Sequence, residues 1–164
     1  MPILQLDPDK PLGKKMQQLQ TYFFLLLGLP LILFLVAYLR AEQPGFQASY
    51  DWPQAAHLLI WAIVLGTTFY AWRRANNPVK LERNARSLED KFGAYSRVNM
   101  QSYGLLVLCM LIISGLLWLG THVLYAGLFS IVLIAMASIR PGAEQFIQRM
   151  KLSTEEQAEL LEQE

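Results

Sequence analysis

The sequence is poor in the side chains on which most catalytic and redox sites depend. Its single cysteine, Cys109, excludes an intrachain disulfide and the cysteine pairs of four-helix disulfide-forming enzymes. It contains no HExxH, no GxSxG and no glycine-rich phosphate loop followed by lysine. These absences argue against the common metalloproteases, serine hydrolases and nucleotide-binding enzymes, and we expect a protein that is not an enzyme.

Acidic and basic side chains are also missing from four apolar stretches, 22–39, 55–72, 103–119 and 123–139. Each approaches the roughly 20 residues that a membrane-spanning helix needs. They are apolar on all faces, whereas a helix on a soluble core keeps a polar face. The sequence therefore predicts an all-α integral membrane protein with four transmembrane helices. Ion-coupled transporters keep an ionisable residue in the membrane, so proton-coupled export is disfavoured.

The basic residues that are present are unevenly placed. Of the 14 lysines and arginines, 13 lie before the first stretch, between the second and third, or after the fourth. The positive-inside rule places these segments, and both termini, in the cytoplasm. The predicted divisions are a tail at 1–20, a membrane hairpin at 21–73, a linker at 74–100, a second hairpin at 101–139 and a tail at 140–164.

The two predicted hairpins resemble each other in sequence. Residues 20–22 read QTY and residues 101–103 read QSY, and an apolar run follows each. The stretches 57–59 and 122–124, HLL and HVL, match at a different offset. This pattern favours a parallel tandem repeat whose pseudo-twofold axis lies along the membrane normal. Chance similarity between apolar helices is the alternative.

The linker at 74–100 is predicted to be a basic amphipathic helix. Its apolar residues recur at steps of three and four, which is the spacing of one helical face: Leu81, Ala85, Leu88, Phe92 and Tyr95. Two interpretations stay open. The helix lies on anionic headgroups at the cytoplasmic surface, or it packs on the cytoplasmic end of the bundle.

The C-terminal tail predicts two further short helices. The first covers about 143–152, with Phe146, Ile147 and Met150 on one side. Residues 153–156, STEE, form a capping box that begins a second, acidic helix. Residues 155–164 carry five glutamates and no basic residue. This acidic helix docks on the basic linker, docks on a partner, or is solvated.

Small residues four apart on the second and fourth predicted spans are candidates for close helix packing. They are Ala62 with Gly66, and Ala126 with Ser130. Such pairs let helix backbones approach each other in lipid.

His57 and His122 begin the second and fourth predicted spans. Histidines on facing helices hold haem in four-helix membrane cytochromes. At about 100° per residue, however, His122 shares a face with the small residues of its helix and His57 does not. Two interfacial histidines are therefore the favoured interpretation, and we expect no cofactor and no metal.

The tail reads RPxxExFI from Arg140 and KLSxEE from Lys151. Together with the two membrane hairpins, this pattern resembles that of small uncharacterised four-helix inner-membrane proteins of bacteria. The resemblance implies a location in the bacterial inner membrane. No functional residue is carried over from it, because no activity is assigned to such families.

Three functions stay open from sequence. The first is a non-catalytic accessory subunit, scaffold or homo-oligomer that works through helix packing and its cytoplasmic faces. The second is a small carrier or pore for neutral or lipid-like molecules, and the third is a haem-binding redox subunit. The expected partners are the lipid bilayer and either a second copy or another membrane protein, and no nucleic acid.

Overall fold

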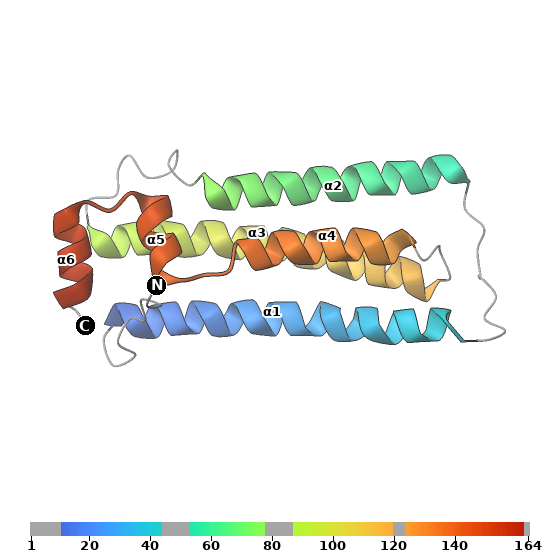
Figure 1. Ribbon diagram of the computed structural model, residues 1–164, viewed down its shortest axis with the longest axis horizontal. Helices are drawn as coiled ribbons and strands as arrows, with labels where there is room; N and C mark the ends of the chain where they lie inside the picture. The colour runs from blue at the N-terminus through green and yellow to red at the C-terminus, as the bar shows by residue number, and fades with distance from the viewer. Residues whose placement is uncertain (1–10, 44–52, 78–86, 120–123, 163–164) are drawn as a thin grey trace.

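The computed structural model describes residues 11–43, 53–77, 87–119 and 124–162, which form helices and no strand. The helices are α1 (Pro11–Ala41), α2 (Gln54–Asn76), α3 (Leu88–Trp118), α4 (Leu124–Ser138), α5 (Ala143–Met150) and α6 (Thr154–Glu162). The prediction of an all-α chain is confirmed. Four helices run along the bundle, and α5 and α6 lie across one of its ends (Figure 1).

Three of these helices, α1, α2 and α3, are long and apolar enough to cross a membrane. α4 has only 15 residues. It reaches the required length only when it is joined to α5, from which it is bent by 80°. The described residues therefore contain three candidate spans, or four if α4 and α5 together count as one.

α3 is the central helix of the bundle. α1 packs mainly on α3, while α2 packs on α3 and α4, so that α1 and α2 flank the middle pair (Figure 1). Half of the apolar window of α3 is buried, against 17% in both α1 and α2. The two helices of each predicted hairpin run antiparallel. α1 and α2 pack on α3 and not on each other, so the first hairpin is not a packed unit. The tandem repeat stays a prediction.

The first turns of α3 replace the separate linker helix that the sequence predicts. Ser87 caps α3, its Oγ accepting a hydrogen bond from the Asp90 N–H at 3.1 Å, and the helix then continues into the apolar stretch. Leu88, Phe92 and Tyr95 are buried in this extension. The predicted apolar face therefore packs on the end of the bundle. Leu81 and Ala85 lie outside the described residues.

α1 is also longer than its apolar stretch. It begins at Pro11, the first helical position, where the missing proline N–H has no intrahelical partner to lose. It continues through Pro30 as one helix to Ala41. The predicted N-terminal tail at 1–20 is therefore helical from Pro11 onward.

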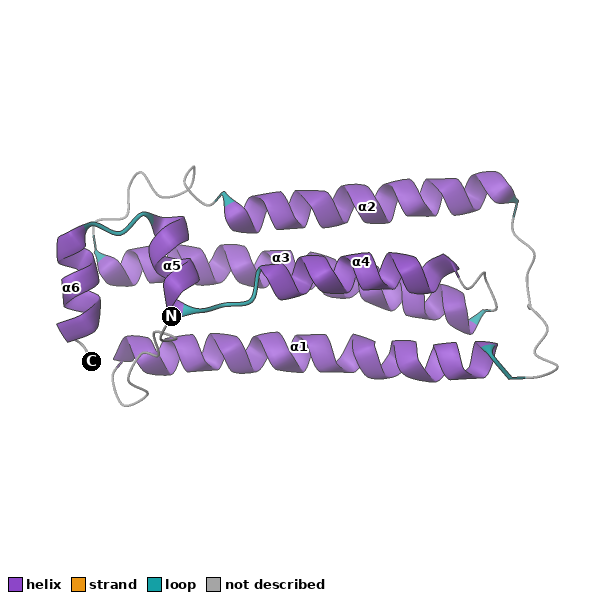
Figure 2. Cartoon of the chain, viewed as in Figure 1, coloured by secondary structure: helices purple, strands orange, loops and turns teal. Residues whose placement is uncertain are grey.

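The two short helices of the tail are confirmed. α5 ends at Met150, and its C-cap Lys151, with a left-handed backbone (φ 49°), turns the chain toward α6. The capping box forms as predicted: Ser153 Oγ accepts from the Glu156 N–H at 3.2 Å, and Glu156 Oε2 accepts from the Ser153 N–H at 2.8 Å. A short loop joins α4 to α5, a second joins α5 to α6, and α6 lies near the beginning of α3 (Figure 2).

The end of the bundle that carries α5 and α6 is called the α5–α6 end. α1 and α3 begin there, and α2 and α4 finish there (Figure 1). At the opposite end, the Arg40 guanidinium lies 4.3 Å from the ring centre of Trp118 and joins α1 to α3. The His57 ring bonds to Tyr125 there and joins α2 to α4.

Candidate functional site

The charged side chains of the described residues gather at the α5–α6 end. The cations there are Lys14, Lys15, Arg73, Arg74, Lys91, Arg97, Arg140, Arg149 and Lys151. At the opposite end the described residues include one basic side chain, Arg40. Most of the charged contacts of the described residues are therefore made at the α5–α6 end.

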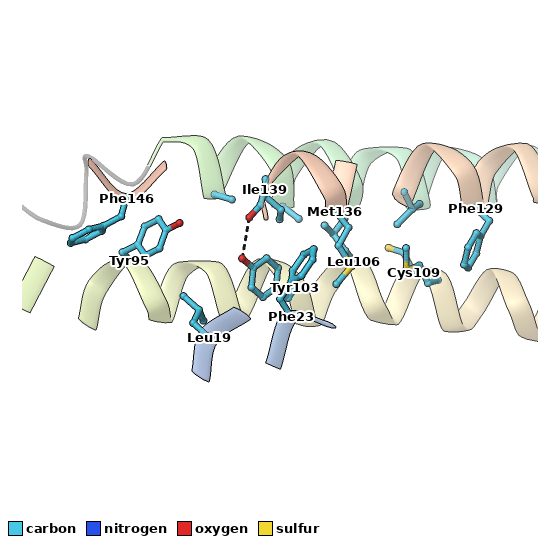
Figure 3. Close-up of a cluster of buried hydrophobic side chains, with 14 of the residues drawn as sticks. Leu19, Phe23, Tyr95, Tyr103, Leu106, Cys109, Phe129, Met136, Ile139 and Phe146 are labelled. Atoms are coloured by element: carbon cyan, nitrogen blue, oxygen red, sulfur yellow. Dashed lines mark hydrogen bonds between the residues drawn. The ribbon is translucent and has the colours of Figure 1, made fainter. Parts of the chain in front are cut away.

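α5 is fastened to α3 by aromatic contacts. Phe146 is fully buried, with its ring centre 5.2 Å from that of Tyr95 and 5.5 Å from that of Phe92. Both pairs are edge-to-face, the arrangement that aromatic quadrupoles favour. Figure 3 shows Phe146 and Tyr95 facing each other from α5 and α3. α5 therefore packs on the amphipathic first turns of α3.

A polar network, which we call the Arg149 bridge, lies beside these rings. Asn99 is 1% exposed, and its Nδ2 donates to the Tyr95 carbonyl at 2.9 Å. Arg149 Nη1 donates to Asn99 Oδ1, and its Nη2 donates to the Ser138 carbonyl, each at 3.4 Å. The bridge therefore connects α5 to α3 and to the last turn of α4, whose carbonyls have no partner within their own helix.

The end of α4 has a second donor from α3. The Tyr103 hydroxyl donates to the Ile139 carbonyl at 3.0 Å (Figure 3). Tyr103 is fully buried, and its ring also meets Phe23 of α1 edge-to-face at 5.2 Å. Side chains thus satisfy the Ser138 and Ile139 carbonyls where the chain turns after α4, while the backbone N–H groups of the next residues satisfy those of Met136 and Ala137.

The Arg149 bridge joins a cation to neutral acceptors. Burial lowers the pKa of the Arg149 guanidinium, and nearby Tyr95 and Tyr103 oppose this effect. An arginine guanidinium nevertheless stays charged at neutral pH. Within the described ranges no carboxylate pairs with it. Its contribution is therefore positional, because it fixes the angle between α4 and α5.

α6 is held by an ion pair. Lys91, in the first turn of α3, donates to Glu156 Oε1, and both side chains keep about a fifth to a quarter of their surface exposed (19% and 25%). Leu152, just before α6, and Leu160, within it, are both buried. Of the three interpretations of the acidic tail, the structure shows docking on the basic segment for the described part.

We expect acid to loosen α6. The hydrogen bond from Lys91 is the main reason that the pKa of Glu156 lies below its usual value, and the Ser153 N–H adds to it. A carboxylate with a lowered folded-state pKa adds stability above its unfolded pKa of roughly 4.3, and loses it as pH falls through the folded value. Because both groups are partly exposed, the contribution is below about 1 kcal/mol.

Hydrogen exchange of the α6 amides at neutral and acid pH, corrected for the intrinsic rate, measures this loosening. Lys91→Met should remove most of the pH dependence that belongs to docking. Lys151→Met removes an exposed cation beside α6 and should leave it intact. Equal behaviour of the two variants would contradict a specific role for the Lys91–Glu156 pair.

Of the two histidines, the structure describes His57. His57 Nδ1 lies 2.9 Å from the Tyr125 hydroxyl, which joins the beginnings of α2 and α4. His122 lies outside the described residues. Within the part of the chain that the structure describes, no group of three or more His, Cys, Asp or Glu side chains is placed to hold a metal ion. Haem binding by the pair stays the disfavoured alternative of the sequence analysis.

The small-residue pairs do not make the predicted contact within the chain. Ala62 and Gly66 lie on the exposed side of α2, Ser130 is exposed and Ala126 is half-buried. The Ser130 hydroxyl donates to the Ala126 carbonyl of its own helix at 3.0 Å. The buried side of α2 consists of other residues: Val64, Thr68, Ala71 and Ala75. The small pairs therefore remain candidates for contact with another chain.

Three residues of the α5–α6 end, Arg149, Asn99 and Tyr103, escaped sequence reasoning as site residues. Arg149 stands in a short charged helix, and Asn99 stands just before an apolar stretch. Helical spacing identifies neither residue, because Arg149 bonds to Asn99, 50 residues away in the chain, and to Ser138, 11 residues away. What the arrangement does is mechanical: it holds α5 and α6 in a fixed position against α3.

No family model, no curated protein and no solved structure matches the chain.

Proposed function

We propose that the chain is a non-catalytic integral membrane protein that acts as a scaffold or accessory subunit through its α5–α6 end. The observation that carries this proposal is the attachment of α5 and α6. Aromatic packing at Phe146, the Arg149 bridge and the Lys91–Glu156 pair all join this short tail to α3. A tail that served only to keep the protein soluble would not need three independent attachments.

The attached helices present a surface of fixed shape. Their outward side is polar and exposed: Glu144, Gln148, Lys151, Ser153, Thr154 and Glu155. A preorganised surface binds a partner at lower entropic cost than a segment that must fold on binding. The partner that fits is another membrane protein, or a second copy of this chain, that reaches the same side of the bilayer.

Length and charge support the proposed placement in the membrane. α1 and α3 have 31 residues each, about 46 Å at 1.5 Å per residue, which exceeds the roughly 30 Å of bilayer hydrocarbon. The excess, together with most cations, lies at the α5–α6 end, which the positive-inside rule assigns to the cytoplasm. The bacterial inner membrane is the location that the resemblance of the tail suggests.

The test is affinity purification of the tagged chain from its own membranes in mild detergent, with mass spectrometry of the bound proteins. A stoichiometric partner is expected. Glu144→Lys combined with Gln148→Lys, on the exposed side of α5, should release it. Gln54→Lys changes an exposed residue at the opposite end and should not. A chain that purifies alone and as a monomer, or a partner lost equally from both variants, would contradict the proposal.

A further inference from the structure

A groove lies between α1 and α3 at the α5–α6 end, on a side that the proposed scaffold surface does not use. Its volume is about 420 Å³, within the range of roughly 300–1,000 Å³ for ligand pockets. Buried Leu19 and Phe92 form its apolar floor. We call it the α1–α3 groove.

The groove has a net positive charge. Three ionisable side chains of the Lys, Arg and Glu types line it: Lys15, Glu89 and Arg97. Lys15 and Glu89 neutralise each other through an ion pair of 3.0 Å. Arg97 is exposed, and the described residues give it no acidic partner. One uncompensated guanidinium therefore faces the groove.

The groove lies at the depth of lipid headgroups, given the membrane placement proposed above. The apolar stretch of α1 begins seven residues after Lys15, which is about 10 Å along the helix, and that of α3 begins six residues after Arg97, about 9 Å. Headgroups occupy roughly 5–8 Å on each side of the hydrocarbon. Long basic side chains extend toward the interface from just outside it. Tyr22, at the membrane side of the groove, is half-exposed.

We propose that the α1–α3 groove binds the headgroup of an anionic phospholipid with one negative phosphodiester, such as phosphatidylglycerol. Arg97 binds the phosphate, since its planar fork of donors matches phosphate oxygens. Ser96 and Gln18 line the same groove and offer further donors to the glycerol hydroxyls. Basic pockets between membrane helices are a known setting for anionic headgroups. This proposal rests on the membrane placement and not on a protein partner.

The first test measures lipid binding to the purified full chain by native mass spectrometry and by melting temperature in detergent. Phosphatidylglycerol is compared with phosphatidylcholine. The wild type should prefer the anionic lipid, and Arg97→Gln should weaken its binding about fivefold, the loss expected for one cation near a headgroup. Lys14→Gln removes a neighbouring exposed cation that does not line the groove, so it should have little effect.

Two further variants change the groove without removing a cation. A Cβ added at Gly93 meets no atom within 4 Å, so Gly93→Trp should fill the groove without displacing the backbone of α1 or α3. It should abolish the lipid preference, while Gly93→Ala should keep it. Glu89→Gln releases Lys15 from its ion pair, raises the charge of the groove by one and should strengthen anionic-lipid binding.

Three outcomes would overturn the assignment. If Lys14→Gln weakens binding as much as Arg97→Gln, the attraction belongs to the whole basic surface. If Glu89→Gln and Gly93→Trp both bind as the wild type does, the groove is not the site. If soluble glycerol phosphate displaces phosphatidylglycerol from the groove, the groove is a site for free anions and its ligand is not a lipid. Because the purified chain is tested without partners, these outcomes are independent of the scaffold proposal.

Discussion

Phe146→Ala should detach α5 and α6 from α3 and lower the free energy of unfolding by about 3–5 kcal/mol, the usual cost of deleting a buried phenyl ring. Phe146 is fully buried and meets both Phe92 and Tyr95 edge-to-face. These rings come from the part of α3 that extends beyond its apolar stretch. Without Phe146, the buried side of α5 is reduced mainly to Ala143 and Met150.

Hydrogen exchange of residues 143–162 measures this detachment, and a melting curve in detergent measures the global loss. Gln148→Ala, two residues away on the exposed side of α5, is the matched control and should change neither quantity measurably. Protection of α5 that persists in Phe146→Ala would show that the other attachments suffice. The scaffold proposal predicts, in addition, that Phe146→Ala loses the partner.

Arg149→Met should cost about 1–3 kcal/mol, the penalty for leaving a buried polar group without its partner. Methionine replaces the length of the side chain and supplies no donor. The Asn99 amide oxygen, on a residue that is 1% exposed, then loses its donor, and so does the Ser138 carbonyl at the end of α4. We expect a larger change in the position of α5 than in the packing of α1, α2 and α3.

The melting temperature and a spin-label distance between α4 and α5 would report this change. Arg149→Lys should recover part of the loss, because one ammonium cannot bridge the two acceptors as the guanidinium fork does. Gln148→Met controls for the exchange of a polar side chain for methionine on the same helix. An unchanged distance in Arg149→Met would mean that Phe146 and the Lys91–Glu156 pair define the position of α5.

The short helices could be predicted from sequence because their signals are local. The STEE capping box lies within four residues and forms with both of its hydrogen bonds. The apolar side of α5 follows from the helical spacing of Phe146 and Met150, and both are buried. The extent of α1 and α3 was missed, since a change of composition from polar to apolar does not end a helix that lacks a breaking residue.

The neighbours of each long helix could not be predicted in the same way. An amphipathic helix shows which face it buries, but a helix that is apolar on all sides shows none. The small residues Ala62 and Gly66 suggested one face of α2, and α3 packs against another. The Arg149 bridge and the contact between His57 and Tyr125 join residues that are distant in the chain, so no spacing rule identifies them.

The central position of α3 has a consequence for the order in which the chain can assemble during synthesis. α1 and α2 leave the ribosome before α3, and each makes its main contacts with α3. Neither can reach its final neighbours until translation has passed Trp118, so the first half of the chain must wait as two separate helices. Assembly then proceeds outward from α3. α5 and α6 are synthesised last, and they complete the bundle by binding the first turns of α3.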